Sequence, residues 1–207
     1  MSGFNIHFNL ATCLTWLRIA LIPAVVGVHY LPDTYLSASA KNTVSMLLFV
    51  LAALTDWFDG YIARKYNQSS AFGAFLDPVA DKLMVVAALC VLMEMERVNA
   101  ALAFLIIGRE LTISALREWM ASVGKQASVA VNSLGKFKTI TQMFAIPLLL
   151  FDVTINISIV PLMSNITGVQ YLHTRPVGTA LLLIAALLTI LSMVYYFRLA
   201  AKALRTN

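Results

Sequence analysis

Charged side chains are scarce in this 207-residue sequence, and the scarcity excludes most soluble architectures. They make up 12% of the chain, whereas 60% of it is hydrophobic and the mean hydropathy is +0.81. A soluble domain carries roughly 25% charged residues. The sequence therefore predicts an integral membrane protein.

Cysteine is also rare, and a basic face suited to nucleic acid is missing. Cys13 and Cys90 are the two cysteines, and both lie in apolar runs. We expect them to be buried small hydrophobes without a redox or metal role. The net charge is +5, but basic and aromatic residues do not interleave along one face. The excess charge is therefore expected to suit a membrane surface, with no nucleic-acid partner.

Six segments are predicted to cross the membrane as helices. The clearest is Val177–Phe197, which has 21 residues without a charge, and about 20 are needed to span the hydrocarbon. Because lipid forces backbone groups to pair within each helix, the expected fold class is all-α. We predict a polytopic six-transmembrane-helix bundle that forms one domain over residues 1–207. The other five spans are predicted at Leu10–Leu31, Asn42–Ala63, Asp77–Met95, Val98–Trp119 and Lys136–Val160.

Basic residues fall unequally on the two sides of these spans. Three lie on one side, namely Lys41, Arg97 and Arg175. Nine lie on the other side, namely Arg64, Lys65, Arg117, Lys125, Lys136, Lys138, Arg198, Lys202 and Arg205. The positive-inside rule places the side with nine basic residues in the cytoplasm, and both termini with it.

Four aspartates stand within 26 residues of a chain that has only ten acidic residues. Asp56 and Asp59 are three apart at the end of the second predicted span, and Asp77 and Asp81 are four apart at the start of the third. Each pair therefore shares one helix face. If the chain turns back within residues 65–72, the two helix ends bring the four carboxylates together.

These carboxylates need positive charge near them. Each costs on the order of 3 kcal/mol at membrane depth, and carboxylates spaced four apart repel each other. No histidine or cysteine is near in the sequence, so Mg²⁺ or Mn²⁺ fits the oxygen ligands better than zinc. Two such ions at a bilayer edge suit displacement at phosphorus, which implies a phosphate-bearing substrate. For Asp77 alone, the alternative is capping of a helix that begins at Pro78.

The spacing of this region resembles that of a known family. The motif reads Asp56-x2-Asp59-Gly60-x2-Ala63-Arg64-x8-Gly73-x3-Asp77-x3-Asp81. It is similar to the signature of the CDP-alcohol phosphotransferases, which are six-helix membrane enzymes and usually homodimers. The resemblance implies that the four aspartates bind two metal ions and that Asp81 is also the general base. It also implies a CDP site lined by Gly60, Ala63, Arg64 and Gly73.

Two further segments extend the resemblance. The run FNLATCLTWLRIALIP resembles the family's first helix, and it keeps Thr15 and Arg18. The run from Gly108 to Gln142 is similar to the corresponding region of bacterial members that make phosphatidylglycerol phosphate. Convergent Arg and Lys suit an anionic phosphate, although Arg109 has the alternative of a buried pair with Glu110 or an aspartate. The residues expected to bind the acceptor phosphate are Arg109, Arg117, Lys136 and Lys138.

The resemblance implies an enzyme of the bacterial inner membrane whose active site faces the cytoplasm. It would transfer the phosphatidyl group of CDP-diacylglycerol to sn-glycerol 3-phosphate and release CMP. The partners are then these two substrates, membrane lipid and a second copy of the chain. Two alternatives stay open: the same chemistry with another acceptor such as inositol phosphate or serine, and a divalent-cation transporter.

Overall fold

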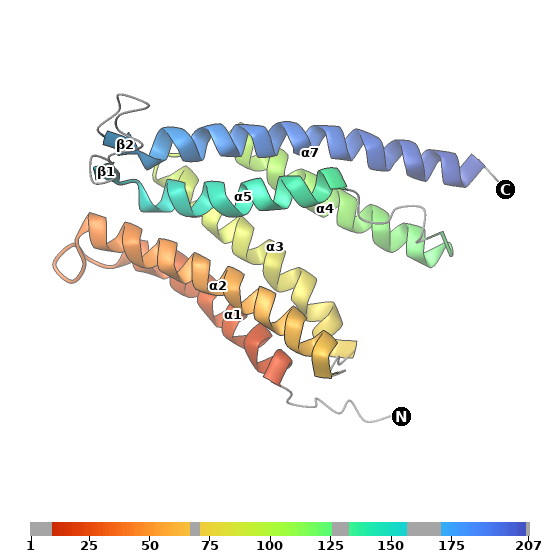
Figure 1. The fold of residues 1–207 in the computed structure, drawn as a ribbon, viewed down its shortest axis with the longest axis horizontal. Coiled ribbons are helices and arrows are strands. Elements are labelled where there is room, and N and C mark those ends of the chain that lie inside the picture. The colour runs from red at the N-terminus through yellow and green to blue at the C-terminus, as the bar shows by residue number, and fades with distance from the viewer. Residues whose placement is uncertain (1–9, 67–70, 126–132, 157–170, 206–207) are drawn as a thin grey trace. The chain divides into compact units, whose positions relative to one another are not determined.

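The chain forms helices over most of its length. A computed structural model describes residues 10–66, 71–125, 133–156 and 171–205, which contain six α-helices and one two-stranded sheet. The chain divides into two compact units, Met1–Glu94 and Met95–Asn207, and each is described by itself. Figure 1 shows the helices of both units in chain order. The prediction of a single domain over residues 1–207 stays a prediction.

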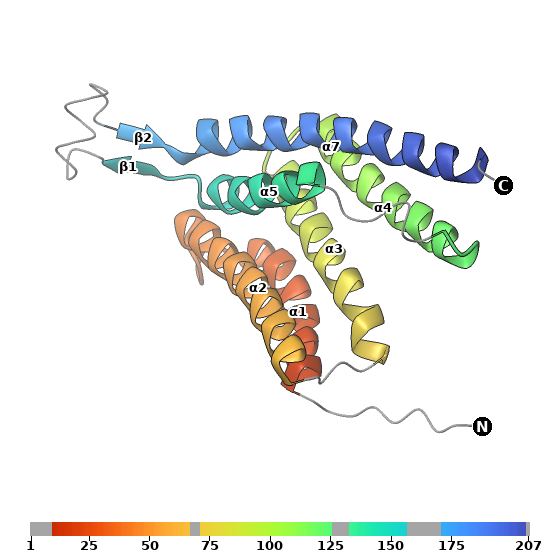
Figure 2. The same ribbon diagram turned by 45° about the vertical axis from the view of Figure 1, so that its right-hand side comes forward.

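The first unit is built around its first helix. Helix α1 (Leu10–Gly27) leads into a short 3-10 turn (Val28–Tyr30), and α2 (Ala38–Tyr66) and α3 (Ala71–Glu94) follow. Helix α1 packs against both α2 and α3. In Figures 1 and 2, the end of α2 and the start of α3 lie at the same end of this unit, so the two helices run in opposite directions. Its buried core includes Leu21, Val25, Phe49, Ala52, Ala80, Met84, Ala88 and Leu89.

The second unit is built on two long helices that lie side by side. Helix α5 (Ser133–Phe151) and α7 (Thr174–Arg205) are joined by β1 (Thr154–Asn156) and β2 (Tyr171–His173), and α4 (Ala100–Ser122) also packs on α7. The two strands are antiparallel and extend beyond the helix ends in Figure 2. The buried core includes Ala103, Ile106, Ile113, Ala145, Ile146, Leu149, Leu182 and Ala185.

A glycine lets α7 approach α5 closely. A Cβ atom on Gly178 would lie 2.8 Å from Cγ of Leu149 and 3.2 Å from the carbonyl oxygen of Ala145. We expect Gly178→Ala to lower the free energy of unfolding by about 1–3 kcal/mol, the usual cost of overpacking. The measurement is thermal unfolding of the purified protein in detergent. Gly27→Ala is the matched control, because a Cβ there meets nothing within 4 Å, and equal melting temperatures would contradict the packing argument.

The described residues are mostly helical, as predicted, with one short β1–β2 hairpin after α5. Two expectations about helix boundaries need correction. The fifth span was expected to run to Val160, but α5 ends at Phe151, since Asp152 adopts φ 42° and Arg97 donates to the carbonyls of Leu149 and Leu150. Those carbonyls belong to the last turn, which lacks partners within the helix.

The third helix begins earlier than the sequence indicated. Helix α3 starts at Ala71, so Pro78 lies inside it and does not begin it. Asp77 is therefore not a capping residue at a helix start, and that alternative is wrong. The carboxylate of Asp77 is bound by another helix instead, as described below.

Among the described residues, three helices are long and apolar enough to cross a membrane. They cover Cys13–Tyr30, Ala38–Phe58 and Thr174–Arg205. The prediction of a helical membrane protein is confirmed at this level. Helices α3, α4 and α5 carry charged residues along their lengths, so the prediction of six spans with cytoplasmic termini stays a prediction. Cys13 and Cys90 are exposed on their helices rather than buried as expected.

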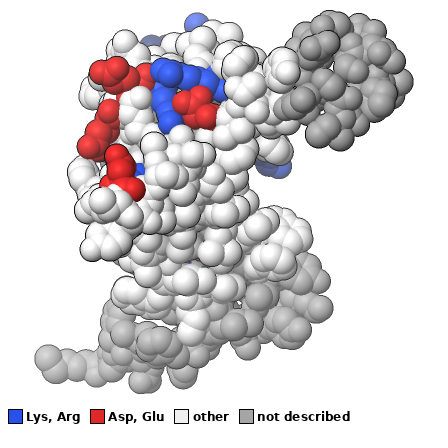
Figure 3. All heavy atoms as spheres, turned by 90° about the vertical axis from the view of Figure 1, so that its left-hand side faces the viewer, with Lys and Arg blue, Asp and Glu red and all other residues white. Residues whose placement is uncertain are grey.

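Lys41, Arg97 and Arg175, the three basic residues assigned to the non-cytoplasmic side of the membrane, have polar partners near the helix ends. Lys41 lies 2.7 Å from Asp33 in the first unit. In the second unit, Arg97 lies 3.2 Å from Asp152, and Arg175 donates to the carbonyl of Glu96. Figure 3 shows a face on which acidic and basic side chains gather next to one another while most of the remaining surface is uncharged. Such pairing lowers the cost of holding charge beside lipid.

Candidate functional site

Helix α1 brings two of the predicted aspartates together in the first unit. Nη2 of Arg18 lies 3.1 Å from Oδ1 of Asp56 on α2, and Nη1 lies 2.8 Å from Oδ1 of Asp81 on α3. The Arg18 side chain is only 1% exposed, whereas the two carboxylates are 38% and 39% exposed. One buried guanidinium thus holds carboxylates from two helices at the surface of the unit.

A third aspartate is held by the same face of α1. The hydroxyl of Thr15 donates to Oδ1 of Asp77 at 2.5 Å. Thr15 and Arg18 are three apart, so they lie on one side of the helix. One face of α1 therefore contacts Asp56, Asp77 and Asp81, three of the four aspartates predicted to converge.

Arg18 is a site residue whose role the sequence reasoning missed. The carboxylates were expected to need positive charge, and only metal ions were considered as its source. The available signal was a single arginine within an otherwise apolar span, because an ionisable residue there is expensive and is usually paired. Its partners could not be identified without the packing of α1 against α2 and α3.

The donor set suits a hard divalent cation. Besides the Arg18 guanidinium, the polar atoms that meet on this face are carboxylate and hydroxyl oxygens, which are the ligands that Mg²⁺ and Mn²⁺ prefer. Arg18 contacts one oxygen of each carboxylate, and both carboxylates are partly exposed. Among the described side chains, no three acidic, histidine or cysteine residues lie close enough together to hold a metal ion. The side chain of Asp59, the fourth predicted ligand, is not among those described.

The predicted CDP site falls on backbone whose side chains the structure does not describe. Gly60, Ala63 and Arg64 lie in the last turns of α2, and Gly73 lies in the first turn of α3. These four residues are close in sequence to the aspartates. Their contacts lie outside the described residues.

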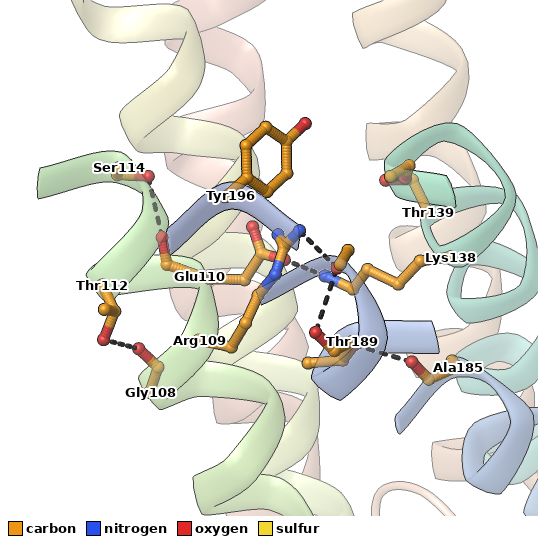
Figure 4. Close-up of polar contacts among 12 residues, drawn as sticks. Gly108, Arg109, Glu110, Thr112, Ser114, Lys138, Thr139, Ala185, Thr189 and Tyr196 are labelled. Atoms are coloured by element: carbon orange, nitrogen blue, oxygen red, sulfur yellow. Dashed lines mark hydrogen bonds and ion pairs between the residues drawn. The ribbon is translucent and has the colours of Figure 1, made fainter. Parts of the chain in front are cut away.

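A second polar cluster lies in the second unit, where α4, α5 and α7 meet. Nη1 of Arg109 donates to Oε1 of Glu110 at 3.2 Å, and Nη2 donates to Oγ of Ser192 at 2.7 Å. Nζ of Lys138 contacts the same Oε1. Figure 4 shows Arg109 and Lys138 both directed toward Glu110. The alternative of a buried pair between Arg109 and Glu110 is therefore confirmed.

Tyr196 links a third cation to this cluster. Its hydroxyl accepts a hydrogen bond from Nη2 of Arg117 at 2.9 Å, and its ring lies 5.1 Å from the Arg117 guanidinium carbon and 5.8 Å from that of Arg109. Both distances allow a cation–π contact. Tyr196 is fully buried and packs with Ile113 and Met120 of α4. This packing holds its ring in place beside the two guanidinium groups.

Three of the four predicted acceptor residues thus gather in one place. Arg109, Lys138 and Arg117 meet through Glu110 and Tyr196, whereas Lys136 is exposed two residues before Lys138 on α5. Residues two apart on a helix do not share a face.

Ser192 and Tyr196 were missed by the sequence reasoning. They are four apart in the uncharged run Val177–Phe197 of α7, and that spacing puts both on one face. This was the available signal for a polar site on α7.

The polar cluster carries more positive than negative charge. Three cations, Arg109, Arg117 and Lys138, stand against one described anion, Glu110, so these four side chains sum to +2. Nε of Arg109 and Nε of Arg117 are buried and have no hydrogen-bond partner within the part of the chain that the structure describes. Buried cations without full compensation are costly. The arrangement therefore suits an added anion of two negative charges.

Comparison with known proteins gives a full-length match. The sequence profile of the CDP-alcohol phosphatidyltransferase family matches residues 8–205. A protein of Salmonella choleraesuis (strain SC-B67), named CDP-diacylglycerol–glycerol-3-phosphate 3-phosphatidyltransferase, is 45% identical over 197 residues, which cover 94% of this chain and 96% of that protein. Proteins with the same name from Shigella flexneri serotype 5b (strain 8401) and Escherichia coli (strain K12) are 46% and 45% identical over 200 residues, covering 95% of this chain and 97% of theirs.

Proposed function

The chain belongs to the CDP-alcohol phosphatidyltransferase family, and we propose that it transfers the phosphatidyl group of CDP-diacylglycerol to sn-glycerol 3-phosphate. The products are phosphatidylglycerol phosphate and CMP. The observation that carries this reaction is identity of 45–46% over almost the whole chain to proteins named for it. The chain is thus an enzyme of phospholipid biosynthesis.

The aspartates of α2 and α3 are the proposed metal ligands. Asp56, Asp59, Asp77 and Asp81 would hold two Mg²⁺ or Mn²⁺ ions, and the oxygen donors on the face of α1 support this assignment. When bound, such ions stabilise negative charge on the pyrophosphate oxygens and the leaving group. Arg18 orients two of these carboxylates from within the unit, and Thr15 orients a third.

Asp81 is the proposed general base. Its carboxylate takes the proton of the primary hydroxyl of glycerol 3-phosphate, and the hydroxyl oxygen forms a bond to the phosphorus that carries diacylglycerol. The bond from that phosphorus to the oxygen bridging it to CMP breaks, and CMP leaves with the electron pair. The contact with Arg18 keeps the Asp81 side chain in one orientation, which is what a positioned base requires.

The remaining assignments follow the family. Gly60, Ala63, Arg64 and Gly73 are the proposed CDP contacts. Three of these residues are small, which lets a nucleotide approach the helices. We place the enzyme in the bacterial inner membrane as a homodimer with its active site facing the cytoplasm. The nine-to-three distribution of basic residues in the sequence supports that orientation.

The cations of α4 and α5 are the proposed acceptor site. A phosphate monoester carries a charge of roughly −1.5 to −2 at neutral pH, which matches the excess of +2 on Arg109, Arg117, Lys138 and Glu110. Lys136 is the fourth proposed contact, from its exposed position on α5. The acceptor is identified by CMP release across a panel of glycerol 3-phosphate, inositol phosphate, serine and glycerol. If another acceptor matched glycerol 3-phosphate, the acceptor assignment would be wrong.

We expect Arg117→Ala to raise the KM for glycerol 3-phosphate by about tenfold or more. A charge-assisted hydrogen bond to phosphate contributes roughly 1.5–3 kcal/mol, and each 1.4 kcal/mol is a factor of ten. The KM for CDP-diacylglycerol should change little. The measurement is steady-state CMP release with each substrate varied in turn.

Arg198→Ala is the charge-matched control for this variant. Arg198 is exposed on α7, two residues beyond Tyr196, and its removal should leave both KM values unchanged. A normal acceptor KM in Arg117→Ala, or an equal rise in the control, would remove Arg117 from the acceptor site.

A further inference from the structure

Two buried cations of the second unit share a single carboxylate oxygen. Oε1 of Glu110 receives both Nη1 of Arg109 and Nζ of Lys138. The cations come from α4 and α5, and Figure 4 shows Glu110 between them. A carboxylate oxygen that bridges two cations has the position that one oxygen of a bound phosphate would take.

The three side chains differ in how firmly they are enclosed. Arg109 is 8% exposed and Lys138 is 3% exposed, whereas the Glu110 side chain is 23% exposed. Arg109 is fixed further by its hydrogen bond to Ser192 and by the ring of Tyr196. The cations are therefore held in place, and Glu110 is the member of the trio that reaches the surface of the unit.

We propose that Glu110 is an internal carboxylate that occupies the phosphate position in the free enzyme and that the acceptor's phosphate must replace. The inference rests on the proposed function, because it takes the acceptor to be a phosphate monoester bound by Arg109 and Lys138. In the exchange, the phosphate takes over the two contacts and the Glu110 carboxylate moves outward to water. No covalent bond changes.

This exchange lowers the affinity for every anionic ligand that enters the position. A dianionic phosphate gains more attraction to the two cations than a monoanionic group does. Both ligands must release the same contacts of Glu110, so the exchange subtracts the same free energy from each. Glu110 would thus lower the absolute affinity, while Arg109 and Lys138 set the preference for the more highly charged ligand.

The test compares two ligands that differ in charge and little in shape. Binding of sn-glycerol 3-phosphate and of glycerol 3-sulfate is measured by calorimetry on the full chain in lipid nanodiscs, without CDP-diacylglycerol. The unmodified protein should bind the phosphate at least about tenfold more tightly, equivalent to roughly 1.4 kcal/mol. In Glu110→Gln both ligands should bind more tightly by a similar factor of about threefold or more, so that their ratio stays the same.

Glu118→Gln is the matched control, since it removes the same charge from an exposed position on the same helix. It should keep both affinities of the unmodified protein. Unchanged or weaker binding in Glu110→Gln would overturn the proposal. A wider ratio would also overturn it, because Glu110 would then stay in place and repel the dianion more than the monoanion. An equal gain in affinity in the control would overturn it as well, because the effect would then be one of overall charge.

A second variant covers the case in which Glu110→Gln does not fold. Glu110→Asp keeps the charge and withdraws the carboxylate by one methylene group, so both ligands should bind more tightly by a smaller factor. No change of affinity in a folded Glu110→Asp protein counts against the proposal. The proposed function fails separately, when the unmodified enzyme releases no CMP with glycerol 3-phosphate. The inference alone fails when that release is normal and neither affinity rises in the Glu110 variants.

Discussion

Removal of divalent metal should stop CMP release almost completely, and millimolar Mg²⁺ or Mn²⁺ should restore it. The family generally depends on a divalent metal ion, and the oxygen donors on the face of α1 fit one. Charge stabilisation by a bound metal is worth several kcal/mol, so we expect a loss of about 10²-fold or more. The measurement is CMP release after the bound metal is stripped and excess EDTA is present.

The control for chelation is re-addition of different ions to the stripped enzyme. Ca²⁺ prefers longer bonds and more ligands than Mg²⁺, so it should restore the activity poorly. Zn²⁺ should also restore it poorly, because the described cluster contains no histidine or cysteine ligand. Full turnover in excess EDTA would disprove the metal assignment, whatever the acceptor.

Asp81→Asn should lose CMP release by at least about 10²-fold, the usual contribution of a positioned general base. The substitution keeps the size of the side chain and removes its ability to accept a proton. Binding of CDP-diacylglycerol should persist, because Asp56 and Asp77 remain on the same face of α1. The measurements are single-turnover CMP release and, separately, binding of CDP-diacylglycerol.

Asp33→Asn is the control for this substitution. Asp33 is 80% exposed and pairs with Lys41 outside the cluster, so its loss should leave turnover unchanged. Near-normal turnover in Asp81→Asn would assign the base to another group. Loss of substrate binding along with turnover would make Asp81 a binding residue and not the base.

The helices and the aspartate pairs were predictable because their signals are local. Uncharged runs of about 20 residues identify membrane helices, and the spacing of Asp56, Asp59, Asp77 and Asp81 fixes their helix faces. The helix ends were less predictable. Helix α5 ends at Phe151, where Arg97, more than fifty residues earlier, donates to the carbonyls of its last turn. A contact between such distant residues leaves no periodic signal in the sequence.

The sequence by itself determined the membrane class, the family and the residue types of the site. Only the tertiary structure decided which charges meet: Arg18 binds Asp56 and Asp81, and Glu110 takes both Arg109 and Lys138. The physical reason is that periodicity along one helix fixes which face a residue occupies, whereas the partner across that face depends on how helices pack. In a chain with so few charges, each buried cation needs an anion, and packing selects the one within reach.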